Sequence, residues 1–248
     1  MITAVLIARN EESRISAWID QMSWCNEILV IDNASTDSTA SIASQRGVRV
    51  MSLESSDFSH LRNYALQQAK SEWIVYIDGD EIVPASLIEE IKSACVFNTS
   101  SAYRLRREDV FWGSALHHGE VRNAFKKGII RLVKKDSGEW KGAVHEEFML
   151  KNGSEKTLPT PLIHFAHDGM SDFLHAINRY STIRADELIS KGVHASVFDI
   201  LVRPFVKFIY TYFILMGFRD GAGGFVYSFM MSFHAFLVRS KMYLKSAK

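Results

Sequence analysis

The sequence predicts an α/β fold: a mostly parallel central sheet flanked by helices, with an amphipathic helical appendage at the C-terminus. Through residues 1–100, short apolar runs alternate with segments of helical periodicity, which is typical of right-handed βαβ units. The run at residues 73–77 is apolar without alternation, as in a strand buried on both faces of a parallel sheet. Residues 199–248 are instead rich in aromatic and basic side chains and predict the appendage.

Each element of the first part follows from a local pattern. Four apolar runs predict strands, and the segments between them predict helices. The strands are expected at residues 4–8, 27–31, 48–53 and 73–77, and the helices at residues 15–22, 38–46 and 61–70. Gly47 ends the second of these helices. After Pro84, the pair Ser86 and Glu89 has the spacing of a capping box and predicts a further helix.

The second part has shorter strands separated by long loops. These strands are expected at residues 103–107, 129–134 and 144–150. A helix follows over residues 172–191, with Ser171 or Asp172 as its cap.

The tail contains two apolar segments, residues 205–218 and 225–238, which Asp220 and several glycines separate. Each is shorter than the roughly 20 residues that span a bilayer. Their aromatic residues, flanked by basic side chains, suit helices that lie in the headgroup zone. Two core helices buried in a dimer interface are the alternative. The flanking basic residues are Arg203, Lys207, Arg219, Arg239, Lys241 and Lys245.

Composition and charge restrict the function classes. Of the 248 residues, 47% are hydrophobic and 23% are charged, which is ordinary for a globular protein. The formal net charge is only +1, so nothing global indicates nucleic acid as a partner. From Arg203 to the end, seven basic residues face one acid, so the tail is the basic part and an anionic surface is its expected partner.

The cysteines and the N-terminus indicate the compartment. Cys25 and Cys95 form no disulfide framework and have no metal-ligand spacing, so both are expected in the core. The chain enters a strand at Ala4 without a charged or cleavable leader, so we expect no signal peptide. Together these features predict a reducing, cytoplasmic compartment.

An acidic cluster follows the most apolar strand. Asp78, Asp80 and Glu81 come directly after the run at residues 73–77, where ligands bind in open α/β sheets. Gly79 leaves room between the two aspartates. Paired carboxylates suit a hard divalent cation such as Mg²⁺, which is usually completed by phosphate oxygens. An acidic turn that caps the next helix is the alternative.

Two later polar stretches are further candidates. His117, His118 and Glu120 lie in a polar loop. Adjacent histidines point to opposite sides of an extended chain, so we expect a substrate-facing loop rather than a shared metal. Glu146 and Glu147 follow His145 at the start of a predicted strand, and simple solvent exposure is their alternative interpretation.

Several stretches together resemble glycosyltransferase family 2, which has the GT-A fold, and more narrowly the branch that adds glucose to the lipopolysaccharide inner core. The first half supplies Val5–Glu12, Val30–Thr39, Phe58 with Arg62–Leu66, and Asp78–Glu81. The second half supplies Ile130–Val133, Val144–Glu146, Asn178–Thr182 and Arg203–Gly221. The similarity therefore covers nearly the whole chain, and its strength lies in the order and spacing of the motifs.

The resemblance implies an inverting transfer of a sugar, namely glucose from UDP-glucose, with a divalent cation (Mg²⁺ or Mn²⁺). Residues 1–100 would then form the nucleotide-sugar half, 101–198 the acceptor half and 199–248 the membrane-association segment. Ala8, Asn10, Glu11 and Asp32 would bind base and ribose, Arg62 the diphosphate, and Asp78 and Asp80 nucleotide and metal. Arg131 and His118 would also bind substrate. Glu146, oriented by His145, would be the general base, with Asp80 also catalytic and Asp80 or Glu81 as alternative bases.

The implied partners are a nucleotide-sugar donor, a lipid-linked glycan acceptor and an anionic membrane surface, with a homodimer left open. The implied location is peripheral, on the cytoplasmic face of the bacterial inner membrane. Two departures from the branch concern substrate contacts: Gly119-Glu120-Val121 after His118, and Asn33-Ala34 after Asp32. A polyprenyl-phosphate sugar transferase and a non-catalytic sugar-nucleotide-binding or membrane adaptor are the competing functions.

Overall fold

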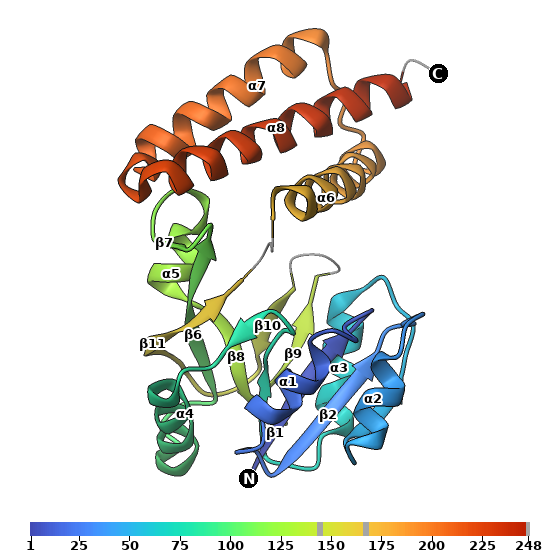
Figure 1. Cartoon of the computed structure of the whole chain (residues 1–248), viewed down its shortest axis with the longest axis vertical. Helices are drawn as coiled ribbons and strands as arrows, with labels where there is room; N and C mark the ends of the chain where they lie inside the picture. Colours follow the sequence, from blue (N-terminus) through green and yellow to red (C-terminus); the bar gives the residue numbers. More distant parts are fainter. Residues whose placement is uncertain (143–145, 166–168, 247–248) are drawn as a thin grey trace. The chain divides into compact units, whose positions relative to one another are not determined.

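The computed structural model describes residues 1–142, 146–165 and 169–246 (Figure 1). The chain forms two compact units. The first, here called the sheet unit, comprises residues 1–107 and 126–164; the second, the helical unit, comprises residues 108–125 and 165–248. These units are defined by contact and cut across the three functional segments expected from the sequence, which remain predictions.

The first half of the sheet is parallel, as the βαβ pattern predicts. Strand β1 (Ile2–Ala8) pairs in parallel with β2 (Glu27–Asp32) and β4 (Trp73–Tyr76), and β2 pairs with β3 (Arg49–Ser52). The connecting helices are α1 (Ile15–Gln21), α2 (Thr39–Gln45) and α3 (Phe58–Gln68). Because these strands run in the same direction, their carboxyl ends lie at one edge of the sheet, at Ala8, Asp32 and the residues after Tyr76.

Antiparallel strands extend this sheet, giving the order β3-β2-β1-β4-β8-β6-β11-β5, with β7 paired to β6. Their bounds are β5 (Glu81–Ile82), β6 (Ala102–Phe111), β7 (Ser114–Leu116), β8 (Ile129–Lys134) and β11 (Glu155–His164). A separate two-stranded sheet joins β9 (Gly138–Lys141) and β10 (Glu147–Leu150). The α/β class of the fold is confirmed, and the parallel pairing lies in its N-terminal part.

Hydrophobic clusters lie on both faces of the sheet, which explains the uninterrupted apolar strands. Ala4 and Leu6 of β1 join a cluster with side chains of α1 and of α4 (Ala85–Phe97), whereas Val5 joins a cluster with α3. Alternate residues of one strand are thus buried on opposite sides.

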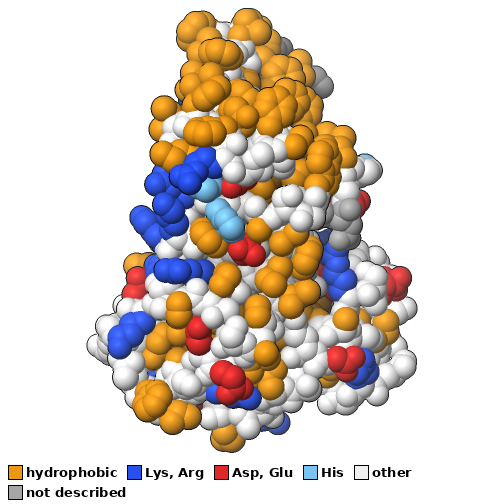
Figure 2. Space-filling model, turned by 60° about the vertical axis from the view of Figure 1, so that its left-hand side comes forward, with side chains coloured by type: hydrophobic (Ala, Val, Ile, Leu, Met, Phe, Trp, Pro, Cys, Tyr) orange, Lys and Arg blue, Asp and Glu red, His pale blue; other side chains and the backbone are white. Residues whose placement is uncertain are grey.

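The helical unit contains a polar helix and a long apolar hairpin. Helix α6 spans Met170–Ser190, and α7 (Val197–Ile209) continues through a π-helical turn (Tyr210–Ile214) to a 3₁₀ turn (Gly217–Asp220) and α8 (Gly221–Ser246). The smaller elements η1 (Gly119–Val121) and α5 (Arg122–Lys127) precede them in the chain. Hydrophobic side chains gather on the surface of this part of the molecule (Figure 2).

Three local predictions are wrong. Helix α4 starts after Pro84 and α6 after Gly169, and neither has a side-chain cap, so Ser86, Ser171 and Asp172 do not act as predicted. A capping box occurs instead at α7, between Ser196 and Asp199.

The break in the tail also lies earlier than predicted. The chain turns at residues 215–220, and the glycines lie in the first turn of α8. A Cβ on Gly224 would sit 2.0 Å from the Gly217 carbonyl oxygen, so glycine permits close approach there rather than ending a helix. The stretch Gly217–Ser246 is consequently long and apolar enough, by length and composition, to cross a membrane.

Candidate active site

The loops that leave β1 and β2 are tied together by hydrogen bonds. Asn10 adopts a left-handed φ of 59°, and its Oδ1 accepts from the Thr36 backbone N–H at 2.8 Å. The Asn10 N–H donates to the Ser35 hydroxyl at 3.0 Å, and the Glu11 N–H donates to the Thr39 hydroxyl at 2.8 Å. These contacts fix Asn10 and Glu11 at the edge where Ala8 and Asp32 also end.

Asp32 presents an unpaired acceptor at this edge. The residue is 7% exposed, and its buried Oδ1 has no hydrogen-bond partner among the described residues. A buried carboxylate oxygen without a donor is costly, so the geometry favours a ligand that brings an N–H or O–H to this atom.

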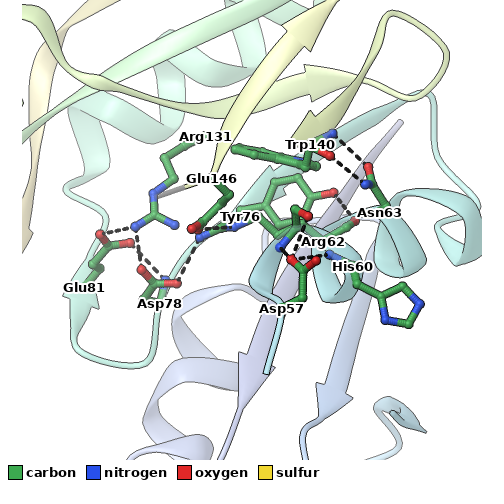
Figure 3. A network of polar contacts seen from close by, with 11 residues as sticks. Asp57, His60, Arg62, Asn63, Tyr76, Asp78, Glu81, Arg131, Trp140 and Glu146 are labelled. Carbon is green, nitrogen blue, oxygen red and sulfur yellow. Dashed lines mark hydrogen bonds and ion pairs between the residues drawn. The ribbon is translucent and has the colours of Figure 1, made fainter. Parts of the chain in front are cut away.

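A buried arginine joins two of the acids after β4. Nη2 of Arg131 donates to Asp78 and, at 2.9 Å, to Oε1 of Glu81, while the Asp78 N–H donates to Glu81 at 2.9 Å (Figure 3). Burial would raise the pKa of Asp78, but the Arg131 and Arg62 guanidiniums hold it well below its usual range. Burial raises the pKa of Glu81, and Arg131 opposes that rise. The side chain of Glu81 is fully buried, which disfavours it as a base for an incoming hydroxyl.

Arg131 also has unused donors. Its side chain is 5% exposed, yet Nε and Nη1 are buried without a partner in the part of the chain that the structure describes. The guanidinium lies between the pair Asp78 and Glu81 and the carboxylate of Glu146 (Figure 3). Buried cationic donors of this kind are suited to anionic oxygens.

Arg62 and Glu146 form the other half of the site. The Arg62 guanidinium carbon lies 4.8 Å from the ring centre of Trp140 and 5.1 Å from that of Tyr76. Its Nε donates to Oε1 of Glu146 at 2.8 Å, and Nη2 lies 4.0 Å from Asp78. The two aromatic rings hold the arginine in place through cation–π contact, and the arginine in turn orients Glu146 (Figure 3).

Asp80 completes a group of carboxylates with Glu11. A Cβ on Gly79 would meet Oε2 of Glu11 at 2.8 Å, so the Glu11 carboxylate lies directly beside this turn. Burial raises the pKa of Glu11, and the negative charges of Asp80 and Asp78 add to that rise while Arg14 opposes it. Oδ2 of Asp80 lies 3.4 Å from Nε2 of His164.

These residues fit a divalent cation that shares a substrate's phosphates. No group of three or more His, Cys, Asp or Glu side chains among the described residues forms a complete metal site. The hard oxygens of Asp78 and Asp80, with Glu11 beside them, suit a cation that takes one or two carboxylates and fills its shell with phosphate and water. Burial is the main cause of the raised Glu11 pKa, and such a cation would relieve the repulsion from Asp80 and Asp78 that adds to it.

The structure thus brings most of the predicted residues together in the sheet unit. They are Ala8, Asn10, Glu11, Asp32, Arg62, Asp78, Asp80, Arg131 and Glu146. His145 lies outside the described residues. His118 belongs to the helical unit, where its Nδ1 lies 2.7 Å from Oδ1 of Asp220, and the backbone N–H groups of His117 and His118 donate to Oδ2 of the same carboxylate.

Sequence reasoning missed three contributors. Tyr76 and Trp140 enclose Arg62, but Tyr76 was predicted only as an apolar strand residue, and Trp140 lies ahead of the strand predicted at residues 144–150. Asp220 binds His118 across 102 positions of sequence, but it read as a break between helices. Asp220 belongs to the Arg203–Gly221 stretch that resembles the family, and this membership could have marked it as a functional candidate.

Comparisons with known proteins concern the family and the fold. The family model described as glycosyl transferase family 2 matches residues 3–171, more than half of the chain. The lipopolysaccharide core biosynthesis glycosyltransferase LpsC of Rhizobium meliloti is 25% identical, over 99% of this chain and 93% of LpsC. An uncharacterized glycosyltransferase of Rickettsia typhi is 24% identical, over 97% of this chain and 86% of its own.

Solved structures support the fold. Residues 1–349 of S. aureus TarS, crystallised with UDP-GlcNAc, superpose with a TM-score of 0.53 at 14% identity, covering 94% of this chain and 81% of that one. Mannosyl-3-phosphoglycerate synthase of Rubrobacter xylanophilus gives a TM-score of 0.53 at 15% identity, covering 79% and 76% respectively. At these identities the similarity concerns the GT-A fold alone.

Proposed function

The chain belongs to glycosyl transferase family 2, and from this premise we propose that it transfers glucose from UDP-glucose, with inversion, to a lipopolysaccharide core or related cell-envelope glycan. The full-length similarity to LpsC supports the acceptor class. The proposed location is peripheral, on the cytoplasmic face of the bacterial inner membrane, where a lipid-linked acceptor would be met.

One observation carries the proposal: buried polar groups of opposite character lie unpaired at the sheet edge. Oδ1 of Asp32 lacks a donor, and Nε and Nη1 of Arg131 lack acceptors, among the described residues. A uracil N–H or ribose hydroxyl matches the first, and diphosphate oxygens match the second. A nucleoside diphosphate is therefore the ligand class that satisfies both.

The chain's own residues then divide the work of an inverting displacement. Glu146 would take the proton of the acceptor hydroxyl as that oxygen attacks the anomeric carbon. The bond from that carbon to the diphosphate breaks, and the leaving group takes the electron pair. Arg62 and Arg131 would stabilise the charge that develops on the diphosphate, and they act from a partly desolvated site where such contacts are strong.

Asp78 and Asp80 would hold a divalent cation. When bound, such an ion supplies Lewis-acid stabilisation of the leaving diphosphate. Arg131 orients Asp78 for this purpose, since it holds that carboxylate ionised.

A binding screen tests the proposal. The full chain is titrated calorimetrically with UDP-glucose, UDP-GlcNAc, GDP-glucose and dTDP-glucose, each with and without Mn²⁺. We expect UDP-sugars to bind, UDP-glucose most tightly, and Asp32→Asn to weaken binding at least about tenfold, because the ligand's N–H loses a charged acceptor. Gln45→Ala, on the solvent side of α2, is the matched control. Absence of binding by every nucleotide sugar would overturn the proposal.

A further inference from the structure

We propose that the surface of the α7–α8 hairpin docks on a lipid bilayer through its apolar side chains, lying in the plane of the interface, and that anionic lipid is not required. The inference deepens the proposed function, on which it rests for one reason: a lipid-linked acceptor lies in a bilayer. The remaining argument comes from the helical unit itself.

The hairpin exposes large apolar side chains well beyond what a soluble surface needs. Nine of them are more than half exposed, from 51% for Phe213 to 71% for Phe198. The other seven are Val197, Leu201, Phe205, Val206, Ile214, Phe229 and Leu244. Phe198, Leu201 and Phe205 have the i, i+3, i+7 spacing of one helix face, and Figure 2 shows hydrophobic side chains covering this part of the molecule.

The basic residues of the tail are largely engaged inside the unit. Nε of Arg203 donates to Asp199 at 2.6 Å, and Nζ of Lys207 lies 2.7 Å from an oxygen of Glu120. Lys245 forms an ion pair with Asp186.

Lys241 is engaged in the same way, by uncharged oxygens. Its Nζ donates to Ser181 at 2.8 Å and to Thr182 at 2.7 Å. Three of the six basic residues flanking the apolar segments are thus paired with an acid, and Lys241 is held against α6, which leaves less free charge to attract anionic headgroups than the sequence suggests. Electrostatic attraction, which the sequence suggests, is therefore replaced here by apolar insertion.

The same contacts argue for a helix lying in the interface rather than a span. Lys241 and Lys245 attach one side of α8 to helix α6, which carries Asn178 and Asp186. Carrying those polar groups into hydrocarbon would be costly. The opposite side of the hairpin has the exposed aromatic residues, so α8 is apolar toward one side only. This arrangement is typical of helices that insert shallowly into a membrane surface.

A bilayer fits this surface better than a second copy of the chain. Protein interfaces that bind specifically carry a rim of polar groups able to pair across the contact. The charged groups beside the exposed stripe already pair within one chain, as Asp199 does with Arg203. A fluid hydrocarbon surface needs no such partners, whereas a homodimer would leave them unused.

Vesicle sedimentation of the full chain tests the proposal. We expect binding to vesicles of neutral phosphatidylcholine, and a change of less than about fivefold when anionic lipid is added at low salt, because one net charge near an anionic surface is worth about that factor. The triple variant Phe198→Gln, Leu201→Gln, Phe205→Gln should weaken partitioning roughly tenfold or more for each side chain. Glutamine keeps the helix propensity high.

Two further variants make the experiment decisive. Arg203→Gln with Arg219→Gln is the matched charge control and should bind neutral vesicles like wild type. Ile214→Gln with Phe229→Gln tests the same surface if the triple variant fails to fold by circular dichroism, and it should also lose binding.

Three outcomes would overturn the inference: binding that requires anionic lipid and disappears at high salt, apolar variants that bind like wild type, or no vesicle binding with concentration-dependent dimerisation on size exclusion. Donor titration without vesicles is independent of all of them. Lost vesicle binding with intact nucleotide-sugar binding refutes the docking alone. Intact vesicle binding without nucleotide-sugar binding refutes the proposed function alone.

Discussion

Replacing Arg131 with methionine should destabilise the sheet unit through a carboxylate that loses its partner. Arg131→Met keeps an apolar stem of similar length in β8 but removes the guanidinium that joins Asp78 and Glu81. Among the residues that the structure describes, the Glu81 carboxylate would then keep only the Asp78 N–H as a donor, at 2.9 Å. The stability measurement does not require the sugar donor or the sugar acceptor to be known, so it tests the electrostatics of the site directly.

Three contributions determine how much free energy of unfolding the Arg131→Met variant loses. Removing one partner of a buried ion pair typically costs about 3–5 kcal/mol, and the fully buried Glu81 meets that description. Asp78 is 44% exposed, so water replaces most of what it loses. Arg131 also has two unpaired buried N–H groups among the described residues, and removing them returns about 1 kcal/mol. The expected net loss is therefore about 3 kcal/mol.

Urea and thermal unfolding, followed by the fluorescence of the buried Trp73 and Trp140, would measure this loss. We expect the midpoint to fall by roughly 6–12 °C. Adding Glu81→Gln to the variant should restore at least about half of the free energy, because the unpaired charge is gone. The variant should also be less destabilised at pH 5 than at pH 8. A carboxyl whose pKa is raised in the folded state favours folding when protonated, and that contribution is lost as pH rises through the raised pKa.

A loss below about 1 kcal/mol, or a double variant no more stable than the single one, would refute the reasoning, since it would mean that the buried pair stabilises the unit by packing rather than by charge.

Three further predictions concern other parts of the chain. Glu146→Gln should lower turnover by about 10²–10⁴ while donor affinity stays within about threefold, and wild-type turnover would exclude Glu146 as the base. Asp57→Ala should cost about 1 kcal/mol at pH 7 because Asp57 caps α3. Hydrogen bonds from Ser59 and His60 lower the Asp57 pKa, so the wild-type advantage should shrink as pH falls through that lowered pKa; a constant difference down to pH 2 would contradict this. Gly128→Ala should cost more than Gly113→Ala in thermal unfolding. Both have φ near +70°, but only at Gly128 would the Cβ meet a backbone oxygen, at 2.6 Å.

The sequence predicted what local pattern determines. The strand at Ile129–Lys134 occurs at the predicted residues, and the parallel strands fall within about a residue or two of theirs. Strands as short as β5, with two residues, have no periodicity to detect. The cap at Ser86 failed because the helix begins one residue after Pro84, so the serine already lies inside it.

The candidate site was predictable where residues are close in sequence and not where they are distant. Asp78 and Asp80 follow one strand, so their shared location could be inferred from that strand alone. The contact of Arg62 with Glu146 spans 84 positions, and that of Arg131 with Glu81 spans 50. Sequence motifs identified these side chains one by one. Their pairing depends on the order and direction of the strands, and the pairing of strands changes from parallel to antiparallel between β4 and β8.

The charges of the site make donor and cation binding interdependent. Arg62 and Arg131 are matched by Glu146, Asp78 and Glu81, so the guanidiniums are already balanced by carboxylates before any substrate arrives. Asp80 and Glu11 add further negative charge; burial raises the pKa of Glu11, and repulsion from Asp80 and Asp78 adds to that rise. A nucleoside diphosphate would bring more negative charge to this edge, and it would be repelled unless a cation came with it. By linkage, the donor must then strengthen cation binding by the same factor as the cation strengthens donor binding. The comparison of UDP-sugar titrations with and without Mn²⁺ measures that factor, and equal affinities in the two would mean that the arginines alone neutralise the diphosphate.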